Sequence, residues 1–146
     1  MVEKARRDLG LKICNCTALR RAARRVSEAY DAKLEQAGLT AAQFGMLVTL
    51  GRLDSASVNR LADEIDLDRT TTGKSLRVLE RTGLVRIKVS EEDGRSRSVK
   101  LTTKGNAALR AAMPLWRAAQ HEFEKQSGRV KSSILRAMLA KLSAPK

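Results

Sequence analysis

Apolar residues recur at intervals of three and four along the start of the chain, which is the spacing of an amphipathic helix. The pattern covers residues 13–36 and stops before Gly38, a residue type that often ends helices. It places six side chains on one face: Cys16, Leu19, Ala23, Val26, Tyr30 and Leu34. A second helix is predicted from Thr40, because Gln43 three residues later completes a capping box. Four of its side chains are expected to be mostly buried: Phe44, Leu47, Val48 and Leu50.

Two shorter helical patterns follow in close succession. Ser57 is a good N-cap residue for the first of them, and Asp68 is a candidate N-cap for the second. Gly83 ends the second helix, and only residues 66–68 separate the pair. Two helices joined by so short a turn predict a helix-turn-helix.

The pattern then changes from helical spacing to alternation. Apolar and polar residues alternate over 85–89, and again over 98–101. An Asp-Gly pair, Asp93 and Gly94, lies between the two runs and is typical of a tight turn. A β-hairpin directly after a helix-turn-helix is the arrangement of a winged helix.

The remainder of the chain returns to helical spacing. Thr102 or Thr103 is expected to cap a long helix, and Pro114 inside it predicts a kink or a break. A final amphipathic helix carries Val130, Ile134, Leu135, Met138 and Leu142. The predicted fold class is therefore mainly α with a small β-hairpin wing, a winged helix-turn-helix lobe flanked by N- and C-terminal helices. A small winged core cannot cover the apolar faces of the flanking helices, and a partner subunit could.

Composition adds that the core is aliphatic. Hydrophobic residues make up 42% of the 146 residues, whereas aromatic residues make up only 3%. A core built from Ala, Leu, Val and Ile favours helices. No apolar run approaches the roughly 20 residues that span a bilayer, and the N-terminus has no apolar segment typical of a secretory signal. We therefore expect a cytoplasmic protein without a membrane partner.

Charge points to a polyanionic partner. The chain has 29 Lys and Arg against 16 Asp and Glu, a net charge of +13. Nucleic acid is the polyanion that fits the helix-turn-helix, because Arg reads guanine, Thr contacts bases and Lys binds phosphate. The predicted DNA contacts on the helices and the first strand are Ser57, Asn59, Arg60, Arg69, Thr70, Thr71, Thr72, Lys74, Ser75, Arg77 and Lys88. The alternative for this helix is a solvated basic face.

The predicted wing carries two arginines beside its turn, Arg95 and Arg97. A hairpin tip has little to pack against, so a purely structural role is a weak explanation. A narrow minor groove has an enhanced negative potential that attracts arginine. We predict that Arg95 enters this groove while the second helix of the helix-turn-helix lies in the major groove, with Asp93 orienting Arg95 through an ion pair.

These motifs resemble those of a known family. "DGRSRSVKLTTKG" is similar to the wing signature of the MarR family of bacterial transcriptional regulators, and "SVNRLADEIDLDRTTTGKSLRVLERTGLV" to its helix-turn-helix. The resemblance implies a homodimer that binds a pseudo-palindromic operator in double-stranded DNA, usually as a repressor relieved by a ligand or an oxidant. It also implies that Arg95 is the minor-groove arginine and Asp93 its partner. The domains expected are a dimerisation helix at 1–36, a DNA-binding lobe at 37–103 and dimerisation helices at 104–146.

Two mechanisms of regulation are compatible with the sequence. In the first, a small anionic effector, an aromatic acid or a thioester, binds a cationic and aromatic set made of Arg20, Arg21, Arg24, Arg25, Tyr30 and Trp116. In the second, Cys16 is an oxidation sensor, since "CTAL" resembles the start of a motif in peroxide-sensing members of the family. Tyr30 matches one tyrosine of those members, whereas Arg20 and Ala41 replace two others. The alternatives are a solvated basic face and a small buried core cysteine.

Other classes of protein fit the sequence less well. His121 is the only histidine and has no Cys or Asp at a useful interval, so neither a metal site nor a Ser-His-Asp arrangement is visible. We therefore expect no enzyme, no metal and no cofactor. A non-specific architectural DNA-binding protein would carry the same charge, but it would not need a helix bearing Arg69 and a row of threonines. A protein-binding adaptor is the third alternative.

Overall fold

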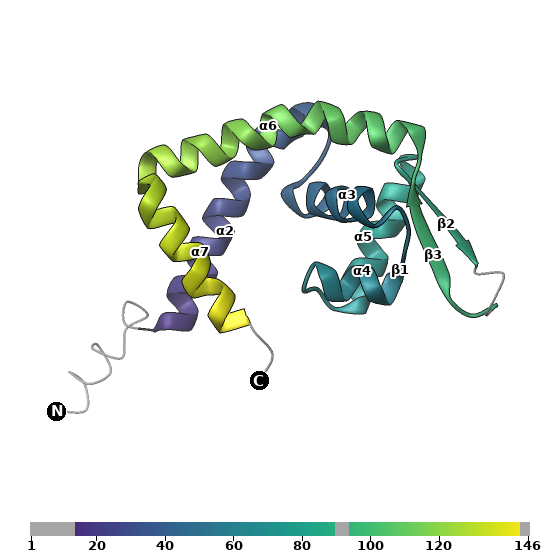
Figure 1. Cartoon of the computed structure of the whole chain (residues 1–146), viewed down its shortest axis with the longest axis horizontal. Coiled ribbons are helices and arrows are strands. Elements are labelled where there is room, and N and C mark those ends of the chain that lie inside the picture. Colours follow the sequence, from purple (N-terminus) through teal and green to yellow (C-terminus); the bar gives the residue numbers. More distant parts are fainter. Residues whose placement is uncertain (1–13, 90–93, 144–146) are drawn as a thin grey trace, which may run out of the picture.

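The computed structural model describes residues 14–89 and 94–143. Apart from the short strand β1, the helices and strands follow one another in the order that the patterning predicts (Figure 1). The elements in chain order are α2 (Asn15–Leu34), η1 (Glu35–Ala37), α3 (Ala41–Leu53), β1 (Ala56–Ser57), α4 (Val58–Glu64), α5 (Arg69–Arg81), β2 (Val85–Val89), β3 (Arg97–Leu101), α6 (Thr103–Ser127) and α7 (Arg129–Ser143). The mainly α, winged helix-turn-helix fold class is confirmed.

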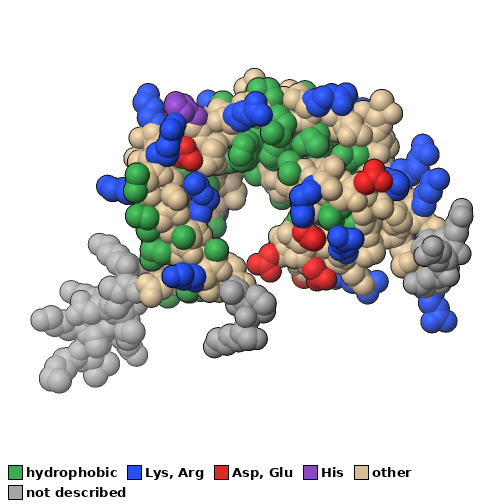
Figure 2. Space-filling view, viewed as in Figure 1, with side chains coloured by type: hydrophobic (Ala, Val, Ile, Leu, Met, Phe, Trp, Pro, Cys, Tyr) green, Lys and Arg blue, Asp and Glu red, His purple; other side chains and the backbone are tan. Residues whose placement is uncertain are grey.

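The elements form a lobe and an arm. The lobe contains α3, α4, α5 and the sheet, and the arm contains α2 and α7 (Figure 1). The long helix α6 runs from the sheet to α7 and packs against both α2 and α3. The space-filling view shows that a hollow beneath α6 separates the lobe from the arm (Figure 2). No helix in the described ranges is both long and apolar enough to cross a membrane.

The wing is part of a three-stranded antiparallel sheet of order β1-β3-β2. In the hairpin, Val85 pairs with Leu101 at one end and Val89 pairs with Arg97 at the other. The two-residue strand β1 adds Ala56 opposite Val99. The alternation of the sequence predicted the hairpin, whereas a strand as short as β1 has no detectable period. The predicted turn residue Asp93 lies outside the described residues.

Local capping signals define the helix boundaries. The Thr40 hydroxyl accepts from the Gln43 backbone N–H at 3.2 Å, and the Gln43 side chain accepts from the Thr40 N–H at 3.0 Å. Ser57 and Asp68 accept from backbone N–H groups at the starts of α4 and α5. Thr102, rather than Thr103, caps α6. These bonds satisfy N–H groups that have no partner within a helix.

The core of the lobe is made of leucines from α3, α4 and α5, together with Val99 of β3. Leu47, Leu61 and Leu76 are fully buried. Phe44 also packs here, with its ring stacked on Trp116 of α6 at 6.0 Å between centroids. Val48 was expected to be buried and is instead 40% exposed. The prediction was wrong because the apolar run in α3 extends around the helix beyond the face that the lobe covers.

Helix α6 passes through Pro114 without a break. Proline removes the N–H that would bond to the carbonyl of Arg110, four residues earlier. Both residues lie on the exposed side of the helix, where water can satisfy that carbonyl. The expected break is therefore absent, since the packing of α6 on α2 and α3 holds the helix together.

The start of α6 is joined closely to the turn that follows α5. The Thr102 hydroxyl donates to the Gly83 carbonyl at 2.6 Å and also accepts from the Gly105 N–H at 2.9 Å. A Cβ on Gly105 would lie 1.9 Å from the Leu84 carbonyl oxygen. Only glycine permits this approach, so the threonine and glycine of "LTTKG" fix α6 to the base of the wing.

The arm exposes a continuous apolar face on α7. Its exposed members are Val130, Ile134, Leu135, Met138, Leu139 and Leu142. On α2, Cys16, Leu19 and Ala23 are also exposed, although the sequence pattern placed them on a buried face. Within one chain the apolar stripe of α2 is covered only toward its C-terminal end, where Leu34 is fully buried.

Candidate nucleic-acid interface

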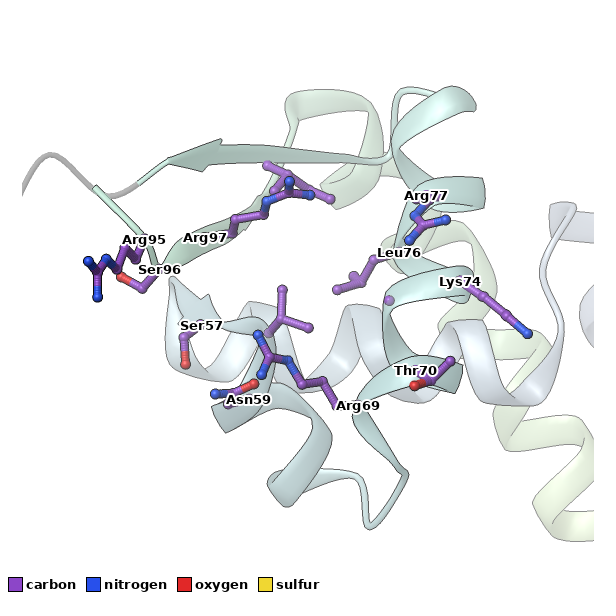
Figure 3. A pocket seen from close by; sticks show the side chains of 13 residues that line it. Ser57, Asn59, Arg69, Thr70, Lys74, Leu76, Arg77, Arg95, Ser96 and Arg97 are labelled. Carbon is purple, nitrogen blue, oxygen red and sulfur yellow. The ribbon is translucent and has the colours of Figure 1, made fainter. Parts of the chain in front are cut away.

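A groove of about 510 Å³ lies between the recognition helix α5 and the hairpin (Figure 3). Its lining includes five cationic residues: Arg69, Lys74, Arg77, Arg95 and Arg97. No acidic residue is found among the described residues that line it. A concave surface with charges of one sign concentrates the electrostatic field and attracts a polyanion.

Helical periodicity places the α5 residues of the groove on one face. Arg69, Gly73 and Arg77 are four residues apart, with Thr70 and Lys74 directly beside this row. Asp68 starts the helix by accepting from the Thr71 N–H at 2.8 Å. The face is therefore presented from a helix whose first turn is fixed.

The N-cap formed by Asp68 is ionised at neutral pH. The Thr71 hydroxyl donates to the second Asp68 oxygen at 2.5 Å, and this bond, followed by the Thr71 N–H, lowers the pKa of Asp68. The carboxylate form is thus stabilised at the N-terminus of α5. Thr71 is exposed but does not line the groove, because its hydroxyl is directed to the cap.

Thr72 was predicted to contact DNA, but the structure does not place it on the groove. Its side chain is fully buried, and its hydroxyl donates to the Asp68 carbonyl at 2.9 Å. It therefore stabilises the first turn of α5 from the inner side. A row of three threonines cannot share one helix face, since successive residues are rotated by about 100°. Ser75, half-buried, does not line the groove either.

Helix α4 contributes the other side of the groove. Ser57 and Asn59, two of the predicted DNA contacts, line it, whereas the exposed Arg60 does not. The Ser57 hydroxyl accepts from the Arg60 N–H at 3.1 Å, so Ser57 also caps α4. Ile87 of β2 also lines the groove.

The wing arginines occupy different positions. Arg97 begins β3 and reaches over the groove, whereas Arg95 points outward near the tip of the wing (Figure 3). Lys88 is exposed on β2 opposite Ser98 and does not line the groove. The proposed pairing of Asp93 with Arg95 falls outside the described residues.

Sequence reasoning missed Gly73 and Ser96, both of which line the groove. Close helix packing does not explain Gly73, because an added Cβ would meet nothing within 4 Å. Its spacing of four from Arg69 and Arg77 was the signal that could have placed it on the same face. Ser96, between the two wing arginines, carried no separate signal.

A second, smaller cavity of about 260 Å³ lies between α2 and α6. Arg25 and Tyr30 line it, together with Lys33 and Phe123. The other predicted effector residues lie elsewhere. Arg20 and Arg21 are exposed on α2 outside the cavity, and Arg24 pairs with Glu28 at 3.1 Å. Trp116 stacks on Phe44 in the core, so the cationic and aromatic set is only partly brought together.

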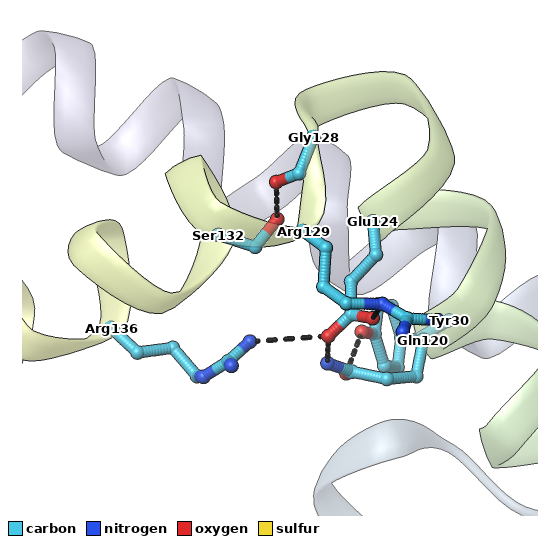
Figure 4. Close-up of polar contacts among 7 residues, drawn as sticks. All are labelled: Tyr30, Gln120, Glu124, Gly128, Arg129, Ser132 and Arg136. Carbon is cyan, nitrogen blue, oxygen red and sulfur yellow. Dashed lines mark hydrogen bonds and ion pairs between the residues drawn. The ribbon is translucent and has the colours of Figure 1, made fainter.

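Tyr30 belongs to a polar network at the elbow between α6 and α7 (Figure 4). Its hydroxyl donates to the side-chain Oε1 of Gln120 at 2.6 Å, and the Nε2 amide group of Gln120 donates to Glu124 at 2.9 Å. Burial raises the pKa of Tyr30, and the charge of Glu124 adds to this effect, so the hydroxyl stays a donor. Arg129 and Arg136 of α7 pair with Glu124 at 3.7 and 3.5 Å.

The two cysteines lie at the start of α2, and both are exposed. Cys16 is thus not a buried core residue of this chain. Cys14 is the N-cap residue of α2, and a hydrogen bond from the Thr17 side chain lowers the pKa of its thiol. Tyr30, expected near the sensing cysteine, is bound to Gln120 instead.

Comparison with known proteins agrees with this geometry. The MarR family model matches residues 37–96, which contain α3 to α5 and β2. The M. tuberculosis transcriptional regulator MosR, solved in complex with DNA, is 38% identical, with 89% of this chain and 97% of that chain covered and a TM-score of 0.76. The chain belongs to the MarR family. This confirms the resemblance of the wing and the helix-turn-helix.

Two further relatives extend the comparison. The transcriptional repressor CouR, bound to a 23-mer DNA duplex, is 30% identical over 90% of this chain and 93% of that chain, with a TM-score of 0.82. The organic hydroperoxide resistance transcriptional regulator of Bacillus subtilis is 30% identical over 62% of this chain. The match spans 61% of that relative's length. These relatives are transcriptional regulators, not enzymes, as expected for this chain.

Proposed function

We propose that this MarR-family protein is a homodimeric, sequence-specific DNA-binding regulator of transcription that acts as a repressor in the cytoplasm. The observation that carries the proposal is the groove, whose lining includes five cationic residues from α5 and the wing. In the proposed complex, α5 enters the major groove and the wing places Arg95 at the adjacent minor groove. The phosphate backbone runs across the cations between them.

The arm carries the surface on which we propose that the second copy packs. Ile134 and Met138 of α7 are 55% and 59% exposed and lie in a continuous apolar face. An apolar face of this kind on a helix is stabilised when a partner covers it. We propose that residues 1–36 and 104–146 form the dimer base, which holds two copies of the 37–103 lobe about 34 Å apart on successive major grooves.

The relatives support repression and DNA as the partner. CouR is a transcriptional repressor bound to a DNA duplex, and MosR was solved with DNA. Both alignments cover most of this chain. An operator with two inverted half-sites follows from the two-fold symmetry of the proposed dimer.

The salt dependence of duplex DNA binding tests this function. Binding through phosphate contacts releases counterions, so the logarithm of the association constant should fall with the logarithm of salt concentration, by about 0.9 per neutralised phosphate. We expect a slope steeper than about −4 for the dimer, measured by fluorescence anisotropy on labelled duplex. Salt-independent binding, or a strictly monomeric protein at micromolar concentration, would contradict the proposal.

We propose that a small aromatic acid relieves repression by binding the cavity between α2 and α6. Arg25 and Lys33 outnumber the single carboxylate of Glu122 in its lining, and Tyr30 and Phe123 supply aromatic surface. The volume of about 260 Å³ suits a single-ring acid better than a coenzyme thioester. A ligand here would contact α2 and α6 together, and could thereby alter the position of the lobe relative to the arm.

A thermal-shift screen of aromatic carboxylic acids tests this regulation. A bound acid should raise the melting temperature of the wild-type protein and not that of Arg25→Ala. Arg24→Ala is the matched control, because Arg24 is on the same helix but outside the cavity. A response that survives Arg25→Ala and is lost in Arg24→Ala would place the effector elsewhere.

Thiol oxidation is a second candidate for the signal, favoured by the environment of Cys14. The Thr17 hydrogen bond lowers its pKa, which increases the fraction of reactive thiolate at neutral pH. The B. subtilis relative is named for organic hydroperoxide resistance. Organic hydroperoxide should then weaken DNA binding by the wild-type protein, less so by Cys14→Ser or Cys16→Ser. Unchanged binding after treatment would remove this candidate.

A further inference from the structure

Gly73 lies at the centre of the DNA-facing side of α5. It is half-buried and lines the groove between Arg69, one turn before it, and Arg77, one turn after it. Thr70 and Lys74, which also line the groove, flank it. The cationic side chains therefore surround a position that has no side chain of its own.

Nothing in the free protein requires a glycine at this position. Gly73 is inside a regular helix, and a Cβ added to it would meet no atom within 4 Å. Gly105 shows the contrast, because its Cβ would lie 1.9 Å from the Leu84 carbonyl oxygen. Gly83 differs again, since its φ of 76° is in the left-handed region that favours glycine.

A glycine in a helix interior lowers stability. It has more conformational freedom to lose on folding than alanine, which reduces the folding equilibrium constant roughly two- to fivefold. At Gly73 no contact within the chain offsets this loss. The free chain therefore gives no structural reason for a glycine at position 73, whereas a ligand that approaches the open side of the groove would.

We propose that Gly73 is the point of closest approach between α5 and the DNA, where a base-pair edge reaches the helix backbone. This inference rests on the proposed function. Arg69, Lys74 and Arg77 can contact phosphates and bases around the position, while the missing Cβ lets the helix sit deeper in the major groove. Gly73 then acts in specificity, because it sets the depth from which the neighbouring side chains reach the bases.

Two substitutions distinguish a close approach of DNA to Gly73 from a need for flexibility in α5. Alanine and leucine are both strong helix formers, so Gly73→Ala and Gly73→Leu stiffen α5 similarly but differ in size. Gly45→Ala in α3 is the matched control. Gly45 is also half-buried and inside a helix, has nothing within 4 Å of an added Cβ, and lies outside the groove.

The probe is a duplex that the wild-type protein enriches from a random pool, compared with a scrambled duplex of the same composition. Gly73→Ala should raise the melting temperature by about 1–4 °C and weaken binding to the enriched duplex about tenfold or more, with a smaller effect on the scrambled one. Gly73→Leu should weaken it further. Gly45→Ala should raise the melting temperature without changing DNA affinity.

Three results would overturn the inference. Wild-type affinity of Gly73→Ala for the enriched duplex would show that no close approach occurs. Equal losses in Gly73→Ala and Gly73→Leu would indicate that flexibility of α5 matters instead. A lower melting temperature in Gly73→Ala would give the glycine a structural role in the free protein. If the wild-type protein enriches no sequence, the proposed function itself fails, and this inference fails with it.

Discussion

At the scale of the residue, the wing combines two arginines with different tasks. Arg97 reaches over the groove toward α5, whereas Arg95 points outward near the tip of the hairpin (Figure 3). An outward guanidinium contributes little to folding, because exposed charges are well solvated. In the proposed complex, Arg97 contacts the DNA beside the recognition helix, and Arg95 enters the neighbouring minor groove.

Substitution of Arg95 by Ala should therefore separate binding from folding. We expect the affinity for operator DNA to fall about tenfold, because a direct contact of this kind is worth about 1–3 kcal/mol. The melting temperature should stay within about 2 °C of the wild-type value. Arg117→Ala removes the same charge from an exposed site on α6 and should affect affinity less. If both substitutions lowered DNA affinity equally, Arg95 would act only through the net charge of the protein and not through a direct contact.

Gly105 is a residue whose role is entirely structural. We expect Gly105→Ala to lower the free energy of unfolding by about 3 kcal/mol or more, because its Cβ would overlap the Leu84 carbonyl. Chemical denaturation followed by circular dichroism measures this change, with Gly45→Ala as the control. Wild-type stability of Gly105→Ala would show that α6 can move away from the wing without cost.

At the scale of the element, the elbow between α6 and α7 is held by Glu124. Its side chain is only 18% exposed and pairs with Arg129 and Arg136 of α7. The Gln120 side chain hydrogen bond, assisted by the two arginine charges, lowers the pKa of Glu124. Gln120 in turn accepts from Tyr30, so the network joins α2, α6 and α7 (Figure 4).

The stability of this elbow should depend on pH in a defined direction. Since the pKa of Glu124 is lower in the folded state, its contribution is complete above the ordinary carboxyl pKa and disappears as pH falls through the lowered value. Glu124→Gln should therefore melt below the wild-type protein at about pH 7, and the difference should close toward about pH 3. Glu122→Gln, on the exposed side of α6, should show no such convergence. A pH-independent difference would contradict an ionic role for Glu124.

Elements whose signals are local could be predicted from the sequence. The capping residues Thr40 and Asp68 fixed two helix starts, and alternation revealed the hairpin. Features that depend on distant partners could not be predicted in this way. Trp116 was assigned to an effector site, but α6 brings it onto Phe44 in the core. Strand β1 exists because β3 pairs with it, and two residues alone carry no pattern.

In the candidate site, too, some residues could be predicted from local sequence and others depended on packing between distant segments. The cationic residues of α5 and the wing could be chosen from residue type and helix position, and the groove brings Arg69, Lys74 and Arg97 together. Thr72 was misplaced because a run of threonines hides which one faces inward. The cationic band at the start of α2 could not be divided by sequence into residues inside and outside a cavity, since that depends on the packing of α2 against α6.

At the scale of the whole molecule, the arm and the lobe have complementary tasks. The lobe carries the cationic groove, and the arm carries the exposed apolar face of α7. The two parts are connected by α6, which contacts α2, α3 and the sheet (Figure 1). We propose that α6 transmits a change in the arm to the distance between the two lobes of the dimer, and so to operator affinity.

A charge placed on the apolar face of α7 should separate the protomers. We expect Ile134→Glu to shift the protein to a monomer and to weaken operator binding at least about tenfold, because a buried unpaired carboxylate is strongly unfavourable at an interface. Analytical ultracentrifugation measures the oligomeric state. Ala140→Glu, on the opposite side of the same helix, should remain a dimer. A dimeric Ile134→Glu variant would place the interface elsewhere.

The central claim is that two copies of the α5–wing groove read a symmetric DNA sequence. Selection of bound duplexes from a random pool by the wild-type protein tests it most directly. We predict enrichment of an inverted repeat whose half-sites are centred about 10 base pairs apart, one turn of the double helix. A protein that binds the pool tightly but enriches no sequence would contradict the claim and indicate a non-specific DNA-binding protein.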